Sequence, residues 1–177
     1  MDKDLIIIGI GGHGKVVLDS ILSNKNFPHK VKGFLDDGDT KEVFGLNKLG
    51  NIYEYTKYIS NYKFHIAIGN NSLRKELALK IGTENLVSIF HKTSYISESS
   101  QIRKGSYIGA MSVINHGCDI GKNSIINTGT IIEHDTSVGE CSHLSYRVLV
   151  GSNSHIEPES YIEMGEILPR GSIWRKK

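Results

Sequence analysis

Apolar residues recur at every sixth position through the second half of the chain. From Phe90 to Ile173 the sequence divides into fourteen hexads that each begin with an aliphatic or aromatic residue; nine have Ser at the fifth place and two have Thr. An α-helix does not have this period, because its turn takes about 3.6 residues. A period of six is typical of a parallel β-helix, in which three hexads form one triangular coil. We expect the first residues to stack inward as the core and the small fifth residues to fit the turns.

The first ninety residues follow a different pattern, in which apolar runs alternate with helix-like segments. "DLIIIGIGGHGKVVLDSIL" predicts a strand, a glycine-rich turn and a helix. "VKGFLDD" and "FHIAIGNN" predict two further strands, "SLRKELALKIG" a helix that ends at a glycine, and "NLVSI" a last strand. This alternation is typical of a small parallel sheet with ligand-binding turns at the carboxyl ends of its strands. The sequence therefore predicts an α/β Rossmann-like domain over residues 1–89 and an all-β parallel β-helix over residues 90–177.

Size and charge exclude several classes of function. The 177 residues carry 21 Lys and Arg against 19 Asp and Glu, a formal charge of +2, and the basic cluster at 174–177 is short. We therefore expect no nucleic-acid partner. The apolar run at 5–8 is too short to span a bilayer and lacks signal-peptide flanks, which predicts a cytoplasmic protein without a membrane partner. Cys118 and Cys141 lack the number and spacing of a disulfide framework or zinc knuckle, so reduced thiols are expected.

The turn after the first predicted strand carries a G-x-G-x-x-G motif. It consists of Gly9, Gly11 and Gly14, and Asp36 follows at the tip of the next strand. Backbone N–H groups at such a turn, together with the positive end of the helix, suit a phosphate or diphosphate. A full dinucleotide fold uses two such halves and only one fits before the hexads, so a nucleotide-linked ligand is favoured over NAD. A merely structural turn is the alternative, and His13 is either a ligand contact or a solvent-facing loop residue.

Ionisable residues gather in the middle of the repeat. His116 and His134 both hold the third place of their hexads, 18 positions apart, so we expect them on one corner of adjacent coils, about 4.8 Å apart along the stack. Two imidazoles this close resist being charged together, so at least one is expected to be neutral and a competent base. Glu133 and Asp135 flank His134, and an acid bonded to one ring nitrogen raises the basicity of the other. Surface residues without a role are the alternative, and a zinc site would need a third histidine.

Four motifs, in this order, resemble one family of bacterial enzymes. They are "GIGGHGKVV", "GFLDD", "FHIAIGNN..R" and "IINTGTIIEHD...GECSHLS", and hexads follow them. Together they are similar to the sugar acyltransferases of the sialic-acid O-acetyltransferase and UDP-4-amino-sugar N-acetyltransferase type, over the chain up to about Leu168. The resemblance implies a left-handed β-helix, a homotrimer, an acetyl-CoA site between neighbouring β-helices and a nucleotide-linked amino sugar held by the α/β domain.

The resemblance also implies roles for the residues that match the family's motifs. His134 is expected to be the general base that takes a proton from the acceptor amine, and Asp135 the acid that enhances its basicity. His143 is expected beside the thioester of acetyl-CoA and Met164 along the pantetheine arm, and no metal is expected. The expected nucleotide-sugar contacts are Gly11, Gly12, His13, Asp36, Asp37 and Gly69.

The predicted function is N-acetylation of a nucleotide-activated amino sugar, of the 4-amino-4,6-dideoxy type, for surface glycan biosynthesis. Direct transfer within a ternary complex needs a base but no covalent enzyme intermediate, so neither cysteine is expected to be a nucleophile. Cys118 holds the small-residue place of its hexad and is expected to be buried in a turn, whereas Cys141 is one place off and free to be exposed.

Three departures from the family pattern weaken the expected donor site. Arg147, with Ser145 and Tyr146, replaces a run of small residues and is expected either to crowd the pantetheine channel or to reach a CoA phosphate. The repeat stops soon after Leu168, which predicts a shortened β-helix. Hexad places usually given to smaller residues hold Glu157, Glu163 and Glu166. Sialic acid O-acetylation and a non-catalytic nucleotide-sugar-binding protein without a CoA site remain alternatives, and the nucleotide and the choice between amine and hydroxyl stay open.

Overall fold

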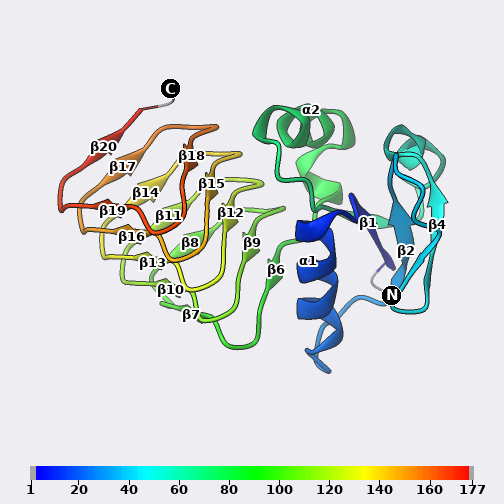
Figure 1. The fold of residues 1–177 in the computed structure, drawn as a ribbon, viewed down its shortest axis with the longest axis horizontal. Helices are drawn as coiled ribbons and strands as arrows, with labels where there is room; N and C mark the ends of the chain where they lie inside the picture. Colours follow the sequence, from blue (N-terminus) through cyan, green and yellow to red (C-terminus); the bar gives the residue numbers. More distant parts are fainter. Residues whose placement is uncertain (1–2, 176–177) are drawn as a thin grey trace.

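The computed structural model describes residues 3–175, and it has an α/β head beside a three-sided β-helix (Figure 1). Lys176 and Lys177 of the basic cluster lie outside the described residues. The head is built on a five-stranded sheet with the order β3-β4-β2-β1-β5. Its strands are β1 (Leu5–Ile8), β2 (Val31–Leu35), β3 (Glu42–Val43), β4 (Leu46–Gly50) and β5 (Lys63–Ile66). Its helices are α1 (Gly12–Leu22), η1 (Ile52–Lys57), α2 (Asn71–Ile81) and η2 (Thr83–Asn85).

Two parts of the head differ from the sequence prediction. A hairpin of β3 and β4 extends the sheet, and β4 runs parallel to β2 while β3 runs antiparallel to β4. The last predicted strand, "NLVSI", contributes to the head sheet only a bridge between Leu86 and Phe64. Its final residue Ile89 instead pairs with Tyr107, in the strand that begins the β-helix. The predicted division between residues 89 and 90 thus falls inside this strand, and it stays a prediction.

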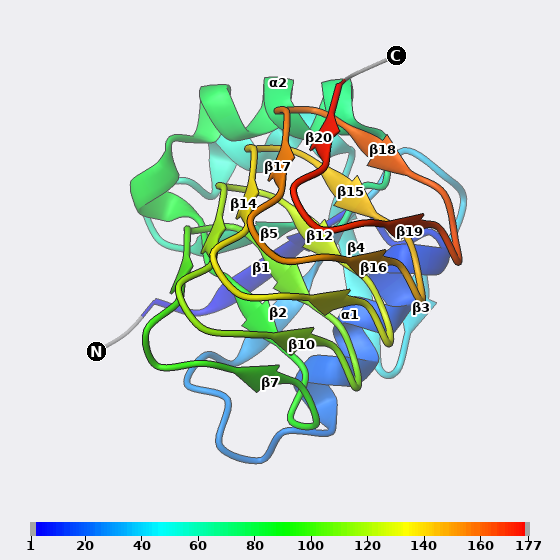
Figure 2. The ribbon, with the colours of Figure 1, turned by 90° about the vertical axis from the view of Figure 1, so that its left-hand side faces the viewer.

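The β-helix consists of three five-stranded parallel sheets, which Figure 2 shows as the sides of a triangular prism in front of the head. The first sheet, next to the head, contains β6 (Ile89–Phe90), β9 (Tyr107–Ile108), β12 (Ile125–Ile126), β15 (His143–Leu144) and β18 (Tyr161–Ile162). The second sheet contains β7 (Tyr95–Ile96), β10 (Val113–Ile114), β13 (Ile131–Ile132), β16 (Leu149–Val150) and β19 (Ile167–Leu168). The third sheet contains β8 (Gln101–Ile102), β11 (Asp119–Ile120), β14 (Ser137–Val138), β17 (His155–Ile156) and β20 (Ile173–Trp174).

The hexad pattern explains the coils, and the predicted left-handed β-helix is confirmed. First-place residues such as Ile120, Ile126 and Ile132 are fully buried in one continuous core. Fifth-place residues are small because their hydroxyls bond to the next coil, as when Ser106 Oγ donates to the Gly121 carbonyl (2.9 Å). The turn itself is made one place earlier, where glycines or residues with positive φ make the corner.

The two cysteines are both buried, Cys118 as expected and Cys141 although its hexad place left exposure open. Cys118 is 2% exposed and its thiol points to the Glu133 carbonyl (3.2 Å). Cys141 holds a corner position with φ 55° and is only 3% exposed. It is covered because α2 lies over this corner, a contact between distant parts of the chain that hexad spacing does not reveal. Among the described residues both thiols are free, and burial raises the pKa of Cys141 to about 11.

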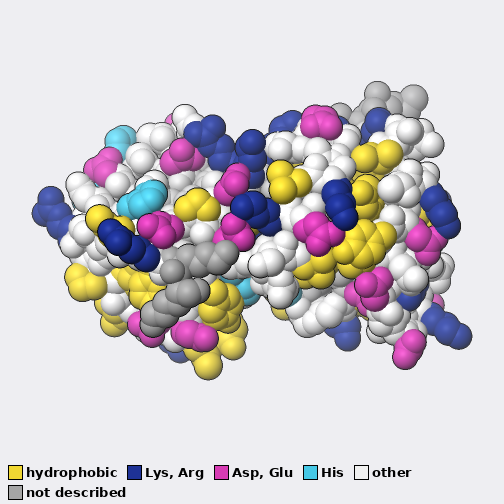
Figure 3. Space-filling model, turned by 90° about the horizontal axis from the view of Figure 1, so that it is seen from above, with side chains coloured by type: hydrophobic (Ala, Val, Ile, Leu, Met, Phe, Trp, Pro, Cys, Tyr) yellow, Lys and Arg dark blue, Asp and Glu magenta, His cyan; other side chains and the backbone are white. Residues whose placement is uncertain are grey.

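On the face seen from above, acidic and basic side chains are interspersed over both head and β-helix (Figure 3). Among the residues that the structure describes, no large area of a single charge is visible on this face. Within residues 3–175, no helix has the length and hydropathy that a membrane crossing would need.

Candidate functional site

The glycine turn between β1 and α1 is held in shape by close packing and by Asp36. Gly9 has φ 91°, and a Cβ on Gly14 would overlap the Gly9 carbonyl, so both positions need glycine. Asp36 accepts hydrogen bonds from the backbone N–H of Ile10 (2.7 Å) and of Gly38 (2.8 Å). The carboxylate predicted to contact the ligand thus also ties the turn to the end of β2.

The beginning of α1 offers unsatisfied N–H donors to an anion. Gly11 is the N-cap, no side chain caps this end, and the first turn contains no acidic residue. The first N–H groups of a helix lack partners within the helix and lie at its positive end, where a phosphate is stabilised. The glycine turn can therefore hold a phosphate group without a lysine or arginine.

All six predicted nucleotide-sugar residues line one cavity of about 450 Å³. Its volume falls within the range of small-molecule sites. Asp37 lies in its wall and accepts a hydrogen bond from the N–H of Ile52 (3.0 Å). The full lining consists of Gly9, Gly11, Gly12, His13, Asp36, Asp37, Gly38, Ile52, Ala67, Ile68, Gly69 and Leu73. We call this cavity the acceptor pocket.

His13 joins the acceptor pocket to the first sheet of the β-helix. Its ring lies edge-on to Tyr107 at 5.2 Å between centroids and 6.1 Å from the ring of His143. Its Nε2 is buried without a hydrogen-bond partner in the structure, so the solvent-facing alternative does not hold. Burial and then the neighbouring His143 lower the pKa of His13 to about 3, so its imidazole is neutral.

His143 lies beside the acceptor pocket, on β15. Its ring meets Tyr161 edge-on at 5.1 Å, and Asn127 Nδ2 lies 3.5 Å from its Nε2. Burial, followed by the charge of Arg74, lowers the pKa of His143 to about 4. A neutral ring can accept or donate a hydrogen bond beside a ligand without adding a charge.

His134 and Asp135 form the predicted pair but lie outside the acceptor pocket. His134 Nδ1 donates to Asp135 Oδ2 (2.8 Å), and the two side chains are 50% and 57% exposed. They occupy the corner between β13 and β14, where the second and third sheets meet. Within one chain, the predicted base therefore lies on the β-helix, apart from the predicted acceptor contacts in the head.

The predicted stack of two histidine rings is not formed. The backbones of adjacent coils are aligned as expected, since the N–H of Asp135 donates to the carbonyl of His116 (2.9 Å). The ring of His116, however, is bonded through Nδ1 to Ser99 Oγ (2.7 Å), and no ring contact with His134 is present in the described part of the chain. Each imidazole is oriented by a different neighbour, which alignment of the backbone does not determine. No group of three possible metal ligands occurs within residues 3–175.

Met164 lies at a second cavity, of about 350 Å³, formed with Tyr146, Arg147 and Gly165. Arg147 has φ 60°, while Gly129 and Gly165 hold the same place one coil before and after it. The Arg147 chain extends over Gly129, which has no side chain to obstruct it. Arg147 thus places a long side chain at a position where the two neighbouring coils have glycine.

Sequence reasoning missed several residues of this region, although one signal was available. Tyr107 and Tyr161 hold the same hexad place as His143, in coils before and after it. Comparing residues 18 positions apart at this hexad place would have identified the column of side chains that faces the head. Arg74, which lies buried beside Gly69, is the arginine of the motif "FHIAIGNN..R", but its role was not predictable, because its partners across the junction are backbone carbonyls.

Comparisons with known proteins agree with this arrangement. Residues 4–81 match the family described as the PglD N-terminal domain. The UDP-N-acetylbacillosamine N-acetyltransferase of Bacillus subtilis (strain 168) is 33% identical over 108 residues, which are 56% of this chain and 48% of that protein. The chain thus spans about half the length of this curated relative.

Two solved structures share the fold over nearly the whole chain. The acetyltransferase domain of PglB from Neisseria gonorrhoeae FA1090, in complex with acetyl coenzyme A, matches with a TM-score of 0.89 and 25% identity, covering 98% of this chain and 85% of that one. A histidine-to-asparagine variant of perosamine N-acetyltransferase from Caulobacter crescentus, in complex with CoA and GDP-perosamine, matches with a TM-score of 0.72 and 27% identity, covering 98% and 89%.

The fold, an α/β head followed by a hexapeptide β-helix, is thus shared with two acetyltransferases of known structure. Residues 4–81 match the PglD N-terminal domain, and the chain is similar to sugar N-acetyltransferases.

Proposed function

We propose that the protein transfers the acetyl group of acetyl-CoA to the amine of a nucleotide-activated amino sugar. The observation that carries the proposal is the acceptor pocket, whose glycine turn and helix end suit a diphosphate and which adjoins His143. Relatives of the same fold bind CoA and GDP-perosamine, a nucleotide-linked amino sugar. The proposed setting is the cytoplasm. The proposed acceptor is a sugar of the 4-amino-4,6-dideoxy type, and its acetylated product is a precursor for surface glycan biosynthesis.

The reaction needs a base at the acceptor amine. A sugar ammonium first loses a proton to solvent, which makes the amine a nucleophile. The amine then attacks the thioester carbonyl and passes its next proton to the base, the C–S bond breaks, and CoA leaves as the thiol with the proton that the base returns. We assign the base to His134, because Asp135 fixes its Nδ1 as the donor and leaves Nε2 free to accept the proton. Direct transfer between two bound substrates requires no cysteine nucleophile, which agrees with the burial of both thiols.

The site is completed by a second copy of the chain in the proposed homotrimer. The outward residues of the second sheet form an apolar column, in which Tyr95 and Ile167 are 58% and 67% exposed. Its members, aligned from coil to coil, are Tyr95, Val113, Ile131, Leu149 and Ile167. The matching column of the third sheet begins Gln101, Asp119, Ser137, His155. An exposed apolar column of this length favours burial against another subunit.

Closure of a trimer would bring the base of one chain toward the acceptor pocket of the next. In a cyclic assembly each contact is heterologous, so one edge of the apolar sheet meets the opposite edge of its neighbour. The corner with His134 borders one edge, and the corner with Tyr146 and Met164 borders the other, next to Asn127 and His143. This arrangement explains why His134 lies apart from the pocket in a single chain. The second cavity, with Met164 and Arg147, is then the proposed place of the pantetheine arm.

Turnover by the purified protein tests the proposal. The assay measures free CoA thiol with acetyl-CoA and a panel of UDP-, dTDP- and GDP-linked amino sugars, and mass and NMR spectra of the product separate an amide from an ester. We expect thiol release that depends on one of these acceptors and yields an amide. A folded protein that releases no thiol with any of them would overturn the proposal, and an ester on a sialic acid would favour O-acetylation.

The second candidate function is nucleotide-sugar binding without catalysis. It is favoured by Arg147, which lies at the second cavity, the proposed place of the acetyl-CoA donor. A non-catalytic protein would bind a nucleotide sugar but not acetyl-CoA, whereas the proposed enzyme binds both. Isothermal titration calorimetry with each ligand distinguishes the two, and Arg147→Gly, which restores the residue of the adjacent coils, reveals whether the arginine obstructs CoA.

A further inference from the structure

Arg74 on α2 is fully buried at the junction of head and β-helix, with 0% of its surface exposed. The five N–H groups of its guanidinium lie within hydrogen-bond distance of six oxygens, so at least one N–H is shared between two acceptors. These oxygens are the carbonyls of Asn123 (2.7 Å), Ile68 (2.8 Å), Gly69 (3.2 Å), Cys141 (2.8 Å) and Ser142 (3.2 Å), and Oδ1 of Asn71 (2.7 Å). A buried guanidinium is costly unless its donors are satisfied, so this network is specific to arginine in that place.

The partners of Arg74 are uncharged oxygens. Within residues 3–175, no carboxylate lies within ion-pair distance of it. Burial lowers the pKa of Arg74 to about 10, so the side chain still carries its charge at neutral pH. A purely structural contact between two surfaces does not need a buried, unpaired charge, because apolar packing is as stable.

The hydrogen bonds join two segments that adjoin the site. Ile68 and Gly69 form a wall of the acceptor pocket, while Cys141 and Ser142 lead directly into His143. The two segments meet at the site, since a Cβ on Gly69 would lie 4.0 Å from Cε1 of His143. Displacing one segment relative to the other would change the distance between the pocket wall and the His143 ring.

We propose that Arg74 is a positioning residue, which fixes the wall of the acceptor pocket against the β-helix turn that carries His143. This inference rests on the proposed function, because it assigns Arg74 to the geometry of that site. Arg74 touches neither substrate nor reacting atom; it acts through Gly69 and His143. The charge has a second consequence, since it is a minor cause of the lowered pKa of His13 and a larger one at His143.

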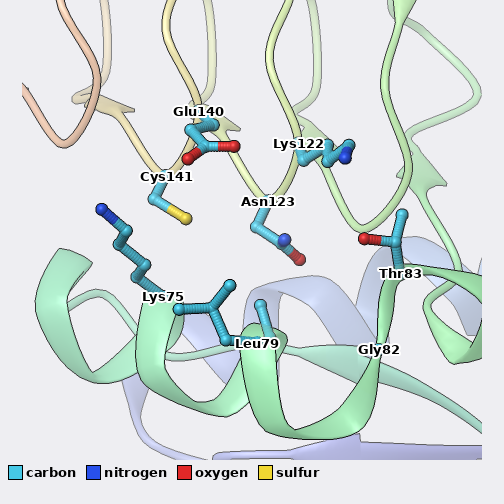
Figure 4. Close-up of a pocket in the computed structure, with 9 residues that line it drawn as sticks. Lys75, Leu79, Gly82, Thr83, Lys122, Asn123, Glu140 and Cys141 are labelled. Carbon is cyan, nitrogen blue, oxygen red and sulfur yellow. The ribbon is translucent and has the colours of Figure 1, made fainter.

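Lys75, the next residue of α2, provides a matched control. Its Nζ pairs with Glu159 of the same β-helix corner (2.6 Å), and Figure 4 shows Lys75 and Leu79 rising from α2 toward Asn123 and Cys141. Lys75 thus holds the head to the β-helix without bonding to Gly69 or Ser142. A role in attachment alone predicts the same effect for both residues.

The test compares Arg74→Lys and Arg74→Met with Lys75→Met in steady-state kinetics, well below each melting temperature. For both Arg74 variants we expect KM for the nucleotide sugar to rise by about tenfold or more and kcat to fall, with KM for acetyl-CoA nearly unchanged. Lys75→Met should keep all three constants. Normal kinetics in an Arg74 variant with a lowered Tm would overturn the inference. If Arg74→Met does not fold, Asn71→Asp keeps an acceptor for the guanidinium but loses the amide that donates to the Glu159 and Ser160 carbonyls, whereas Asn71→Ala loses both; only Asn71→Ala should then give the same split, to a smaller degree.

A second readout does not depend on activity. NMR of ring-labelled histidines follows the titration of His143, whose pKa should rise when the charge of Arg74 is removed in Arg74→Met and stay unchanged in Lys75→Met. An inactive wild type with this shift would reject the proposed function and leave the positioning role standing. Unchanged histidine titration in a folded Arg74→Met protein would reject the positioning role.

Discussion

His134 and Asp135 are adjacent in the chain, yet their side chains are bonded to each other. Adjacent side chains normally point apart, and the pair forms here because Asp135 holds the corner position with φ 57°. The corner thus orients an imidazole without help from a distant residue. Because asparagine also tolerates this conformation, the pair can be altered without losing the turn.

Replacing His134 removes the proposed base. We expect His134→Ala to lower kcat by roughly two to four orders of magnitude while nucleotide-sugar binding is retained. Asp135→Asn, which keeps the turn, should lower kcat less, because it affects only the orientation and basicity of the ring. Thiol release and calorimetry measure the two quantities; near-normal turnover of His134→Ala would show that the base lies elsewhere.

Gly12 allows a test of the proposed phosphate contact with little steric change. A Cβ at this position has no heavy atom within 4 Å in the structure, so Gly12→Ala should fold and bind nearly normally. Gly12→Asp places a negative charge at the end of α1 and should weaken nucleotide-sugar binding by about tenfold or more through repulsion. Calorimetry compares the two variants, and equal affinities would argue that the phosphate binds at another place.

Single residues were predictable where the backbone geometry requires them. The glycine motif identified the pocket, and the hexad places identified the inward residues of the β-helix. The sequence did not reveal that Cys141 lies under α2 or that Arg74 bonds to five carbonyls, because both depend on how head and β-helix meet. The ring of His116 was misjudged because its orientation is set by Ser99.

Among the strands, the second sheet of the β-helix has an unusual outward face. Its outward column is apolar in every coil, whereas the third sheet presents polar residues at the matching places until Ile173. The same strands bury equally apolar residues inward, so folding of one chain does not require the outer column. We attribute this column to contact between subunits.

A charge in this column should separate the subunits. Leu149→Lys introduces an ammonium group that would be buried in the proposed interface, and we expect the trimer to dissociate to monomers. His155→Lys, on the neighbouring sheet and also exposed, should leave the trimer intact. Light scattering after size-exclusion chromatography measures the mass; a trimer in both variants, with unchanged circular dichroism, would exclude the second sheet as the interface.

Elements with a strong period were predicted better than short irregular ones. The period of six gave every coil, and α2 ends at Gly82, which has φ 84°, as its glycine stop indicated. The hairpin of β3 and β4 was missed because its strands are short and partly polar. "NLVSI" was assigned to the wrong sheet because its composition does not show which partner a strand chooses.

In the molecule as a whole, the junction of head and β-helix holds three neutral histidines. They are His13, His143 and His65, whose Nδ1 bonds to the Val87 carbonyl (2.9 Å). Burial is the largest cause of the lowered pKa in each ring, which is about 3 for His13 and about 4 for His65 and His143. The three histidine rings at the junction are therefore neutral at pH 7, whereas Arg74 beside them is charged.

This junction should make stability depend on pH. Since each pKa is near 6.5 in the unfolded chain and near 3 or 4 in the fold, only the unfolded state binds protons between about pH 6.5 and 4. The free energy of unfolding should therefore be constant above this window and fall within it, by on the order of 1 kcal/mol per pH unit for each histidine. Urea unfolding at pH 7 and pH 5 measures the loss. His65→Asn, which keeps a donor for the Val87 carbonyl, should lose less of its free energy of unfolding between pH 7 and pH 5 than the wild type. Equal stability of the wild type at both pH values would contradict the lowered pKa values of the three histidines.

The central claim is that one chain supplies the base and another the acceptor pocket of each site. Two variants with complementary defects, His134→Ala in the base and Gly12→Asp in nucleotide-sugar binding, are co-expressed with different tags, and mixed trimers are isolated by both tags and assayed for thiol release at a nucleotide-sugar concentration well below KM. If the site is shared, one of the three sites in each mixed trimer combines an intact His134 with an intact glycine turn from the neighbour, and activity returns. Mixed trimers as inactive as either parent would contradict the claim, because then both residues would have to come from the same chain.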